Sequence, residues 1–220
     1  MPGGAKAIRE PWRMAAVYLQ RAFGDDFMKL DLPFVKELEQ RGGWPTLRSM
    51  IATKTNCPET TSMGRLFDAV SSLLGVRSQV NYEGQAAIEL EAMADRDCAQ
   101  LYEFRVGSDG NLIEAQDVIH AAVSDLLGGT PPAVVSVGFH RGVSHLIAKI
   151  ADQLRGERKL NRVVLSGGVF QNLLLLQQTV KLLRAIGFEV FTHARVPTND
   201  GGISLGQATI ANALIKLGRI

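Results

Sequence analysis

Two glycine-rich segments in the last third of the chain have the composition of an anion site. The first, Arg162–Asn172 (RVVLSGGVFQN), is a short apolar run that stops at Ser-Gly-Gly and leads into a helical pattern. Gly167 and Gly168 allow a tight turn and a close approach to a ligand, and Asn172 stands where a helix cap belongs. A strand, a glycine turn and a helix N-terminus together favour phosphate, because free N–H groups and the helix dipole both attract it.

The second segment, Thr198–Gln207 (TNDGGISLGQ), adds the carboxylate of Asp200 beside Gly201 at the start of the last predicted helix. One predicted helix and strand separate the two segments, so we expect both at the same end of one sheet. Each segment also has a structural interpretation. The first resembles a common strand-to-helix turn, and in the second an N-cap Asp can precede small residues that let the helix approach its neighbours closely.

A third candidate is Gly64–Asp68 (GRLFD), within a predicted helix. A glycine inside a helix costs about 1 kcal/mol relative to alanine, so a ligand lying against the bare backbone is one reason for Gly64. Asp68 follows four residues later on the same helix face, where its carboxylate can accept a hydrogen bond from a sugar hydroxyl. The structural alternative is an ordinary exposed helix turn.

The histidines form no recognisable metal or catalytic set. His140 and His145 are five residues apart, which does not put them on one face of a helix. His120 and His193 are expected on the surface or in the core. No Ser-His-Asp or Cys-His arrangement follows from the order of residues, so the sequence assigns no catalytic residue.

The composition is that of an ordinary globular protein. The chain has 220 residues, 46% of them hydrophobic and 21% charged, and a formal net charge of +2, which points to no nucleic-acid partner. No apolar run reaches the roughly 18 residues that span a membrane, and the first residues lack the apolar stretch of a signal peptide. Cys57 and Cys98 have no metal-type spacing and are expected to be reduced thiols in a cytoplasmic protein, rather than a disulfide.

The hydrophobic periodicity predicts a helical first part and an alternating second part. Within residues 1–95 we expect five short helices, at about 12–23, 33–40, 46–53, 63–74 and 86–94. A strand at 101–106, a turn at 108–111 and a partner strand at 112–113 follow. The remaining elements are helices at 115–127 and 131–154, a strand at 162–166, a helix at 172–186, a strand at 188–193 and a helix at 201–217. This alternation favours an α/β layer with parallel strands.

Five motifs, in this order and spacing, closely resemble the C-terminal region of the HypF family of hydrogenase-maturation carbamoyltransferases. They are PGGAKAIREPWRMA, CPETTSMGRLFDAVSSLLG, YEGQAAIELE, VVLSGGVFQN and TNDGGISLGQ, and the resemblance runs over residues 1–217. The region is related to the tRNA threonylcarbamoyl-transferases and to the actin and sugar-kinase ATPases. The resemblance therefore implies an α/β, actin-like ATPase (ribonuclease H-like) lobe with a mixed sheet flanked by helices and an N-terminal helical insertion. It divides one continuous domain fragment into a helical part, 1–97, and a nucleotide-binding lobe, 98–220.

The resemblance also implies a function. The family uses carbamoyl phosphate and ATP to form carbamoyl-adenylate, and passes the carbamoyl group to the C-terminal cysteine thiol of a HypE-type acceptor protein, for the cyanide ligands of nickel–iron hydrogenase. By motif, the resemblance implies that Gly64 and Asp68 bind the ribose, and that Gly167, Gly168 and Asn172 contact the nucleotide. It also implies that Glu83 and Gly201 line the cleft. Asp200 would supply a carboxylate to a divalent metal (Fe, Zn or Mg).

The chain departs from the family pattern in several places. The acylphosphatase-like, zinc-finger and adenylate-forming modules and the metal-binding histidine motif have no counterpart in it, and Ala5 stands where most members have Asp. We therefore interpret the chain as the second lobe, an expressed fragment or a truncated gene product, with an incomplete metal site. The alternatives are O-carbamoylation of a small molecule on the same fold, and a non-catalytic lobe that binds nucleotide or a partner or forms homo-oligomers.

Overall fold

The computed structural model describes residues 1–107 and 112–219. The chain forms two compact units, Met1–Ile147 (unit 1) and Ala148–Ile220 (unit 2). The predicted turn at 108–111 lies outside the described residues. The division at residue 97, which rests on the family resemblance, stays a prediction.

Unit 1 consists mainly of helices, and all five helices predicted for residues 1–95 are present. Its elements in this region are α1 (Lys6–Arg9), α2 (Trp12–Phe23), the 3₁₀ helix η1 (Gly24–Lys29), α3 (Pro33–Arg41), α4 (Trp44–Ala52), α5 (Met63–Leu73) and α6 (Gln85–Met93). α7 (Gln116–Leu127) and the first part of the long helix α8 (Pro132–Arg158) complete the unit. The short α1 was not predicted from the sequence.

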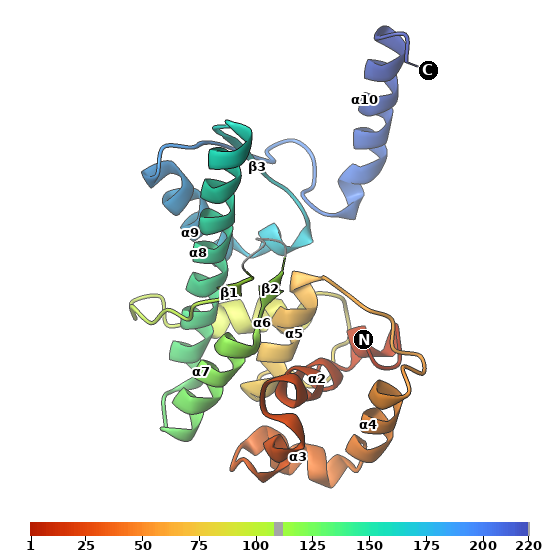
Figure 1. Ribbon diagram of the computed structural model, residues 1–220, viewed down its shortest axis with the longest axis vertical. Coiled ribbons are helices and arrows are strands. Elements are labelled where there is room, and N and C mark those ends of the chain that lie inside the picture. The colour runs from red at the N-terminus through yellow and green to blue at the C-terminus, as the bar shows by residue number, and fades with distance from the viewer. Residues whose placement is uncertain (108–111, 220) are drawn as a thin grey trace. The chain divides into compact units, whose positions relative to one another are not determined.

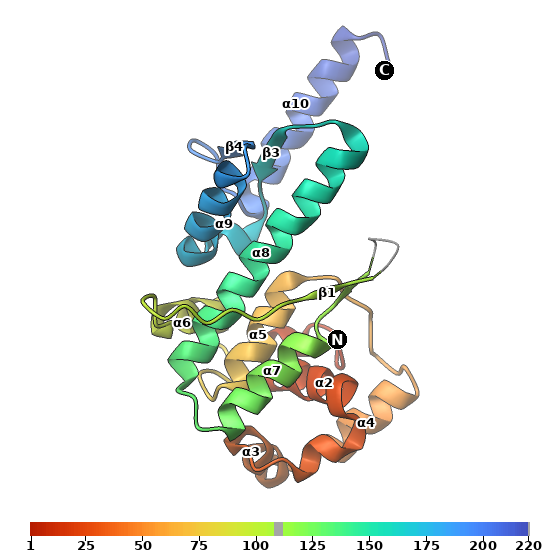
Figure 2. The same ribbon diagram turned by 60° about the vertical axis from the view of Figure 1, so that its left-hand side comes forward.

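Helix α5 lies at the centre of this unit. Every residue from Arg65 to Leu73 is buried, and α2 and α6 pack against the helix (Figures 1 and 2). The ring of Phe67 meets that of Phe139 on α8 edge to face, with centroids 4.8 Å apart. Because α5 is surrounded on all sides from Arg65 to Leu73, its polar residues there are buried together with its apolar ones.

A small antiparallel hairpin follows α6, formed by β1 (Arg105–Val106) and β2 (Ile113–Glu114). The strand expected at 101–106 is much shorter than predicted, because its first half packs on a helix instead of pairing with a strand. The amide of Tyr102 donates to the carbonyl of Gly138 on α8 at 3.2 Å. A Cβ atom at Gly142, one turn later, would lie 2.1 Å from the Tyr102 carbonyl oxygen, so the backbone approaches α8 closely here.

Unit 2 has the predicted alternation of helix and strand. After the end of α8 come β3 (Arg162–Leu165), the 3₁₀ helix η2 (Gly168–Gln171), α9 (Leu173–Ala185), β4 (Glu189–Thr192), the 3₁₀ helix η3 (Asp200–Gly202) and α10 (Ile203–Lys216). β3 and β4 are parallel, with Leu165 opposite Thr192. In place of the expected mixed sheet, the described residues form two separate two-stranded sheets, one antiparallel and one parallel.

Helix α10 contributes no buried residue. Ile210, for example, is 62% exposed. We expected the small residues of this segment to allow close helix packing, and this is wrong for Gly206, where a Cβ would meet nothing within 4 Å. At Gly202 a Cβ would lie 2.7 Å from the Pro197 carbonyl oxygen, so this glycine allows a close turn of the preceding loop rather than packing between helices. Among the described residues, we find no helix with the length and apolar character needed to cross a membrane.

Candidate functional site

The two glycine-rich segments meet at the carboxyl end of the parallel strands, as predicted. The amide of Gly167 donates to the Thr198 carbonyl at 2.8 Å, and the Thr198 hydroxyl donates to the Gly167 carbonyl at 3.2 Å. Gly167 has φ of +107°, a conformation that a side chain would strain. This glycine therefore turns the chain out of β3 and fixes the first segment to the second.

Asn172 is the helix cap that the sequence predicted. Its side-chain oxygen accepts a hydrogen bond from the amide of Leu175 at 2.8 Å, at the start of α9. The side chain is buried at 8% exposure. Asn172 thus has a structural role in presenting the helix N-terminus, and direct contact with a nucleotide stays a prediction.

Asp200 is exposed at the first position of η3. Our interpretation of Asp200 as the N-cap is wrong, because Asn199 occupies that position and accepts from the Gly201 amide at 3.1 Å. The Asp200 carboxylate is therefore not needed to start the helix. Over residues 1–107 and 112–219, no three His, Cys, Asp or Glu side chains gather as metal ligands, so these residues place no cluster of ligands around Asp200.

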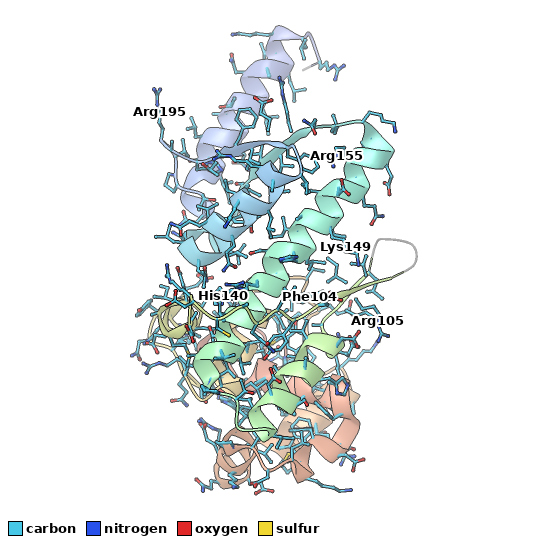
Figure 3. All side chains as sticks on the ribbon, turned by 90° about the vertical axis from the view of Figure 1, so that its left-hand side faces the viewer. Phe104, Arg105, His140, Lys149, Arg155 and Arg195 are labelled. Atoms are coloured by element: carbon cyan, nitrogen blue, oxygen red, sulfur yellow. The ribbon has the colours of Figure 1, made fainter. Side chains whose placement is uncertain are left out.

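Sequence reasoning missed one polar pair at the same sheet edge. Ser166 Oγ and His193 Nε2 lie 2.9 Å apart, and each residue directly follows the last residue of its strand. Their proximity follows from the strand register, which the sequence alone does not give. Arg195, two residues further on, is exposed and its side chain projects from the loop (Figure 3).

The charge of unit 2 differs from that of the whole chain. Residues 148–220 contain ten Lys and Arg but four Asp and Glu, a formal net charge of +6. The overall charge of +2 conceals this difference. A surplus of positive charge attracts polyphosphates and raises their rate of association, so unit 2 is electrostatically suited to an anionic ligand.

The third candidate segment places a charged pair inside unit 1. Asp68 is 3% exposed and Arg65 is 8% exposed. Arg65 Nη1 and Asp68 Oδ2 lie 2.7 Å apart, yet neither atom makes an aligned hydrogen bond with the described residues. The alternative of an ordinary exposed turn is therefore wrong. Arg65 was overlooked, although its spacing of three residues from Asp68 on one helix was a usable signal.

The environment of Asp68 changes its acidity. Burial raises the pKa of this carboxyl to about 6, Arg65 acts in the opposite direction, and the charge of Glu83 raises the pKa further. Glu83, expected to line the cleft, thus lies near enough to Asp68 to affect its ionisation.

A Cβ at Gly64 would meet only Ser62 Oγ within 4 Å, at 3.5 Å, so packing within the chain does not require this glycine. Ser62, at the N-cap of α5, makes no side-chain cap bond.

His140 is a core residue. Its side chain is fully buried on α8 (Figure 3), its Nδ1 lies 2.8 Å from the Ser136 carbonyl oxygen, and its ring contacts that of Phe67. Burial lowers the pKa of His140 to about 4, so the imidazole is neutral at pH 7.

The two cysteines, Cys57 and Cys98, are free thiols, as predicted.

The predicted site residues fall into two groups. Gly64, Asp68 and Glu83 belong to unit 1, whereas the others belong to unit 2, namely Gly167, Gly168, Asn172, Asp200 and Gly201. Each group has its own local geometry: a buried carboxylate beside a bare helix backbone in unit 1, and a glycine-rich strand end with a capped helix in unit 2.

In comparison with known proteins, residues 1–207 match the model of the family described as "Carbamoyltransferase, Kae1-like Domain, second subdomain". Carbamoyltransferase HypF of Rhizobium leguminosarum bv. viciae is 36% identical over 98% of this chain and 27% of its own length. The probable carbamoyltransferase HypF of Methanocaldococcus jannaschii is 31% identical over 93% of this chain and 26% of its own length.

The fold is also that of a solved structure. A crystal structure of full-length HypF in the phosphate- and nucleotide-bound form superimposes with a TM-score of 0.89 at 37% identity, over 98% of this chain and 28% of that protein. This likeness confirms the predicted fold class. The chain spans about a quarter of the length of these relatives.

Proposed function

This chain belongs to the family of the second subdomain of the HypF carbamoyltransferase Kae1-like domain, and from that premise we propose that it is the nucleotide-binding part of a carbamoyltransferase. It would hold ATP-derived carbamoyl-adenylate while the carbamoyl group passes to the C-terminal cysteine thiol of a HypE-type acceptor. The full reaction, with carbamoyl phosphate and ATP as substrates, would use further parts of a HypF protein. The nucleotide in the HypF crystal structure supports this proposal.

The observation that carries the proposal is the buried, imperfectly paired carboxylate of Asp68 next to the bare backbone of Gly64. An ionised carboxylate is a strong acceptor for hydroxyl donors. A ribose hydroxyl approaching over Gly64, which faces no side chain other than Ser62 within 4 Å, would give Asp68 Oδ2 the aligned donor that the chain does not provide.

Unit 2, taken by itself, has backbone and charge suited to the phosphates of a nucleotide. Gly167 and Gly168 bring the backbone to the surface at the end of β3, and Asn172 orders the N-terminus of α9. The net charge of +6 favours the phosphates.

The metal part of the proposal is limited by the donor set. Asp200 offers one exposed carboxylate, and the residues that the structure describes supply no cluster of three ligands around it. The described residues therefore do not make a complete divalent-metal site. A metal at Asp200 would need ligands from another part of a HypF protein, and we derive no step through it.

Calorimetric titration of the purified chain with ATP tests the proposal. We expect binding, and Asp68→Ala should weaken it by about 1–3 kcal/mol because a charged hydrogen-bond acceptor is lost. Asp26→Ala is the matched control, since Asp26 lies in the same unit and its side chain is 77% exposed. Unchanged affinity in Asp68→Ala would remove Asp68 from the site. A cooperatively melting chain that binds no ATP would refute an autonomous nucleotide site.

A further inference from the structure

Arg65 is the largest charged group near the predicted ribose site, and neither the family comparison nor the sequence motif gives it a role. We propose that Arg65 is a positioning residue for nucleotide binding: it keeps the Asp68 carboxylate ionised and oriented to accept hydrogen bonds from a ribose. This inference rests on the proposed function and adds a second residue to the same site.

The geometry supports a fixed arrangement. Both residues lie on the first turns of α5, three positions apart, and the pair joins Nη1 to Oδ2 at 2.7 Å. Both side chains are at least nine-tenths buried, so packing restricts their rotamers. The contact between Nη1 and Oδ2 is an ion pair without an aligned hydrogen bond, which leaves Oδ2 with capacity to accept one from a ligand.

Among the charges around Asp68, Arg65 favours the ionised form of its carboxyl group. Two charged groups act on the carboxyl: Arg65 from the same helix favours ionisation, and Glu83 from the segment before α6 opposes it, as burial does. α2 and α8, which also pack on α5, supply none of the charges that shift the pKa of Asp68. Since a guanidinium stays charged at every accessible pH, Arg65 is the group that favours the ionised acceptor.

A purely stabilising role explains the pair less well. A buried ion pair is often no more stable than apolar residues of similar size, because both charges lose their hydration. Perturbed ionisable residues of this kind occur preferentially at functional sites. A charge pair placed beside an uncovered helix glycine is therefore better explained by a ligand than by folding.

Three variants test the inference: R65M removes the charge, R65Q is the second neutral variant in case R65M does not fold, and R65K restores the charge. The fluorescence of Trp12 and Trp44, both buried in unit 1, reports whether each variant folds. The first measurement is the midpoint of the pH titration of the Asp68 carboxyl, which is monitored by ¹³C NMR in the absence of nucleotide. The second is the affinity for ATP, measured by calorimetry at pH 7 and pH 9.

We expect the midpoint of Asp68 to rise by about one pH unit or more in the neutral variants, because an adjacent opposite charge is removed. Affinity for ATP should then fall about two- to tenfold at pH 7, as the ionised fraction falls, and recover at pH 9. R65K should restore a midpoint near that of the wild type. A merely structural role of Arg65 would lower affinity equally at both pH values.

The outcomes separate the two proposals. If the wild-type chain binds ATP and the neutral variants keep its midpoint and its affinities at both pH values, Arg65 has no positioning role, and the proposed function stands. If the wild-type chain binds no ATP at either pH, the proposed function fails, and the nucleotide role of Arg65 fails with it.

Discussion

Replacing the buried pair by apolar residues, in the double variant R65M/D68L, separates a role in folding from a role in binding. The pKa of Asp68 is about 6 in the folded chain, against 3.8 for a free carboxyl. The shift of about two units corresponds to a cost of about 3 kcal/mol for ionised Asp68 at pH 7, at about 1.4 kcal/mol per unit. The double variant avoids this cost, and we expect it to be as stable as the wild type at pH 7 or more stable, by up to about 3 kcal/mol.

The pH dependence has a definite sign. Because the folded pKa is raised, the folded state binds more protons than the unfolded state between about pH 4 and pH 6, so the wild type loses stability as the pH rises through this range. The double variant lacks this titration. Its advantage over the wild type should therefore be about 2 kcal/mol larger at pH 7 than at pH 4, where the unfolded carboxyl is already partly ionised.

Urea unfolding followed by tryptophan fluorescence is the assay, because Trp12 and Trp44 are the only tryptophans and both report on unit 1. The exposed i,i+3 pair of Asp26 and Lys29 is the control: D26L/K29M should show no comparable difference between the two pH values. The single variant D68L should lose about 3–5 kcal/mol, because it leaves the Arg65 charge buried without a partner. A double variant that is clearly less stable than the wild type at pH 7, with the same deficit at pH 4, would refute the reasoning.

Two glycines give further tests. Gly64→Ala should stabilise unit 1 by about 1 kcal/mol, since a Cβ there meets only Ser62 Oγ at 3.5 Å. The same variant should weaken ATP binding, measured by calorimetry. A gain in stability at unchanged affinity would contradict a ligand on this backbone. Gly142→Ala should lose about 3 kcal/mol in urea unfolding, because its Cβ would lie 2.1 Å from the Tyr102 carbonyl. Gly156→Ala, on the same helix with no atom within 4 Å of the new Cβ, is the control and should not destabilise the chain.

The sequence predicted the elements better than the packing between them. The helices of residues 1–95 and the alternation after residue 160 follow from local periodicity and from glycine and asparagine at the boundaries, so they were predictable. The strand expected at 101–106 was wrong before Arg105, because alternation cannot show that a segment will pack against the glycines of a distant helix. Close approach at Gly142 depends on tertiary structure.

The same distinction applies to the site. Gly167 and Asn172 could be placed from the sequence, since a strand end, a turn and a cap are local features. The pairing of Ser166 with His193 depends on the register of β3 and β4, and register is set by contacts between segments. Burial of Arg65 depends on the whole surroundings of α5, so a charged residue at helical spacing looked like an exposed one.

The surroundings of α5 also suggest why a nucleotide site would retain a buried carboxylate that lowers the stability of the folded chain. A fully solvated Asp would be ionised at pH 7 without help, but water would compete with a ribose for its oxygens. Burial excludes that water and raises the pKa of Asp68 to about 6, close to the point at which the acceptor would be lost. Arg65 opposes that rise. The two residues therefore act together: burial strengthens the hydrogen bond to a ligand, and the guanidinium keeps the acceptor charged. Nucleotide binding at pH 7 should accordingly be weaker when either residue is replaced than when both are present.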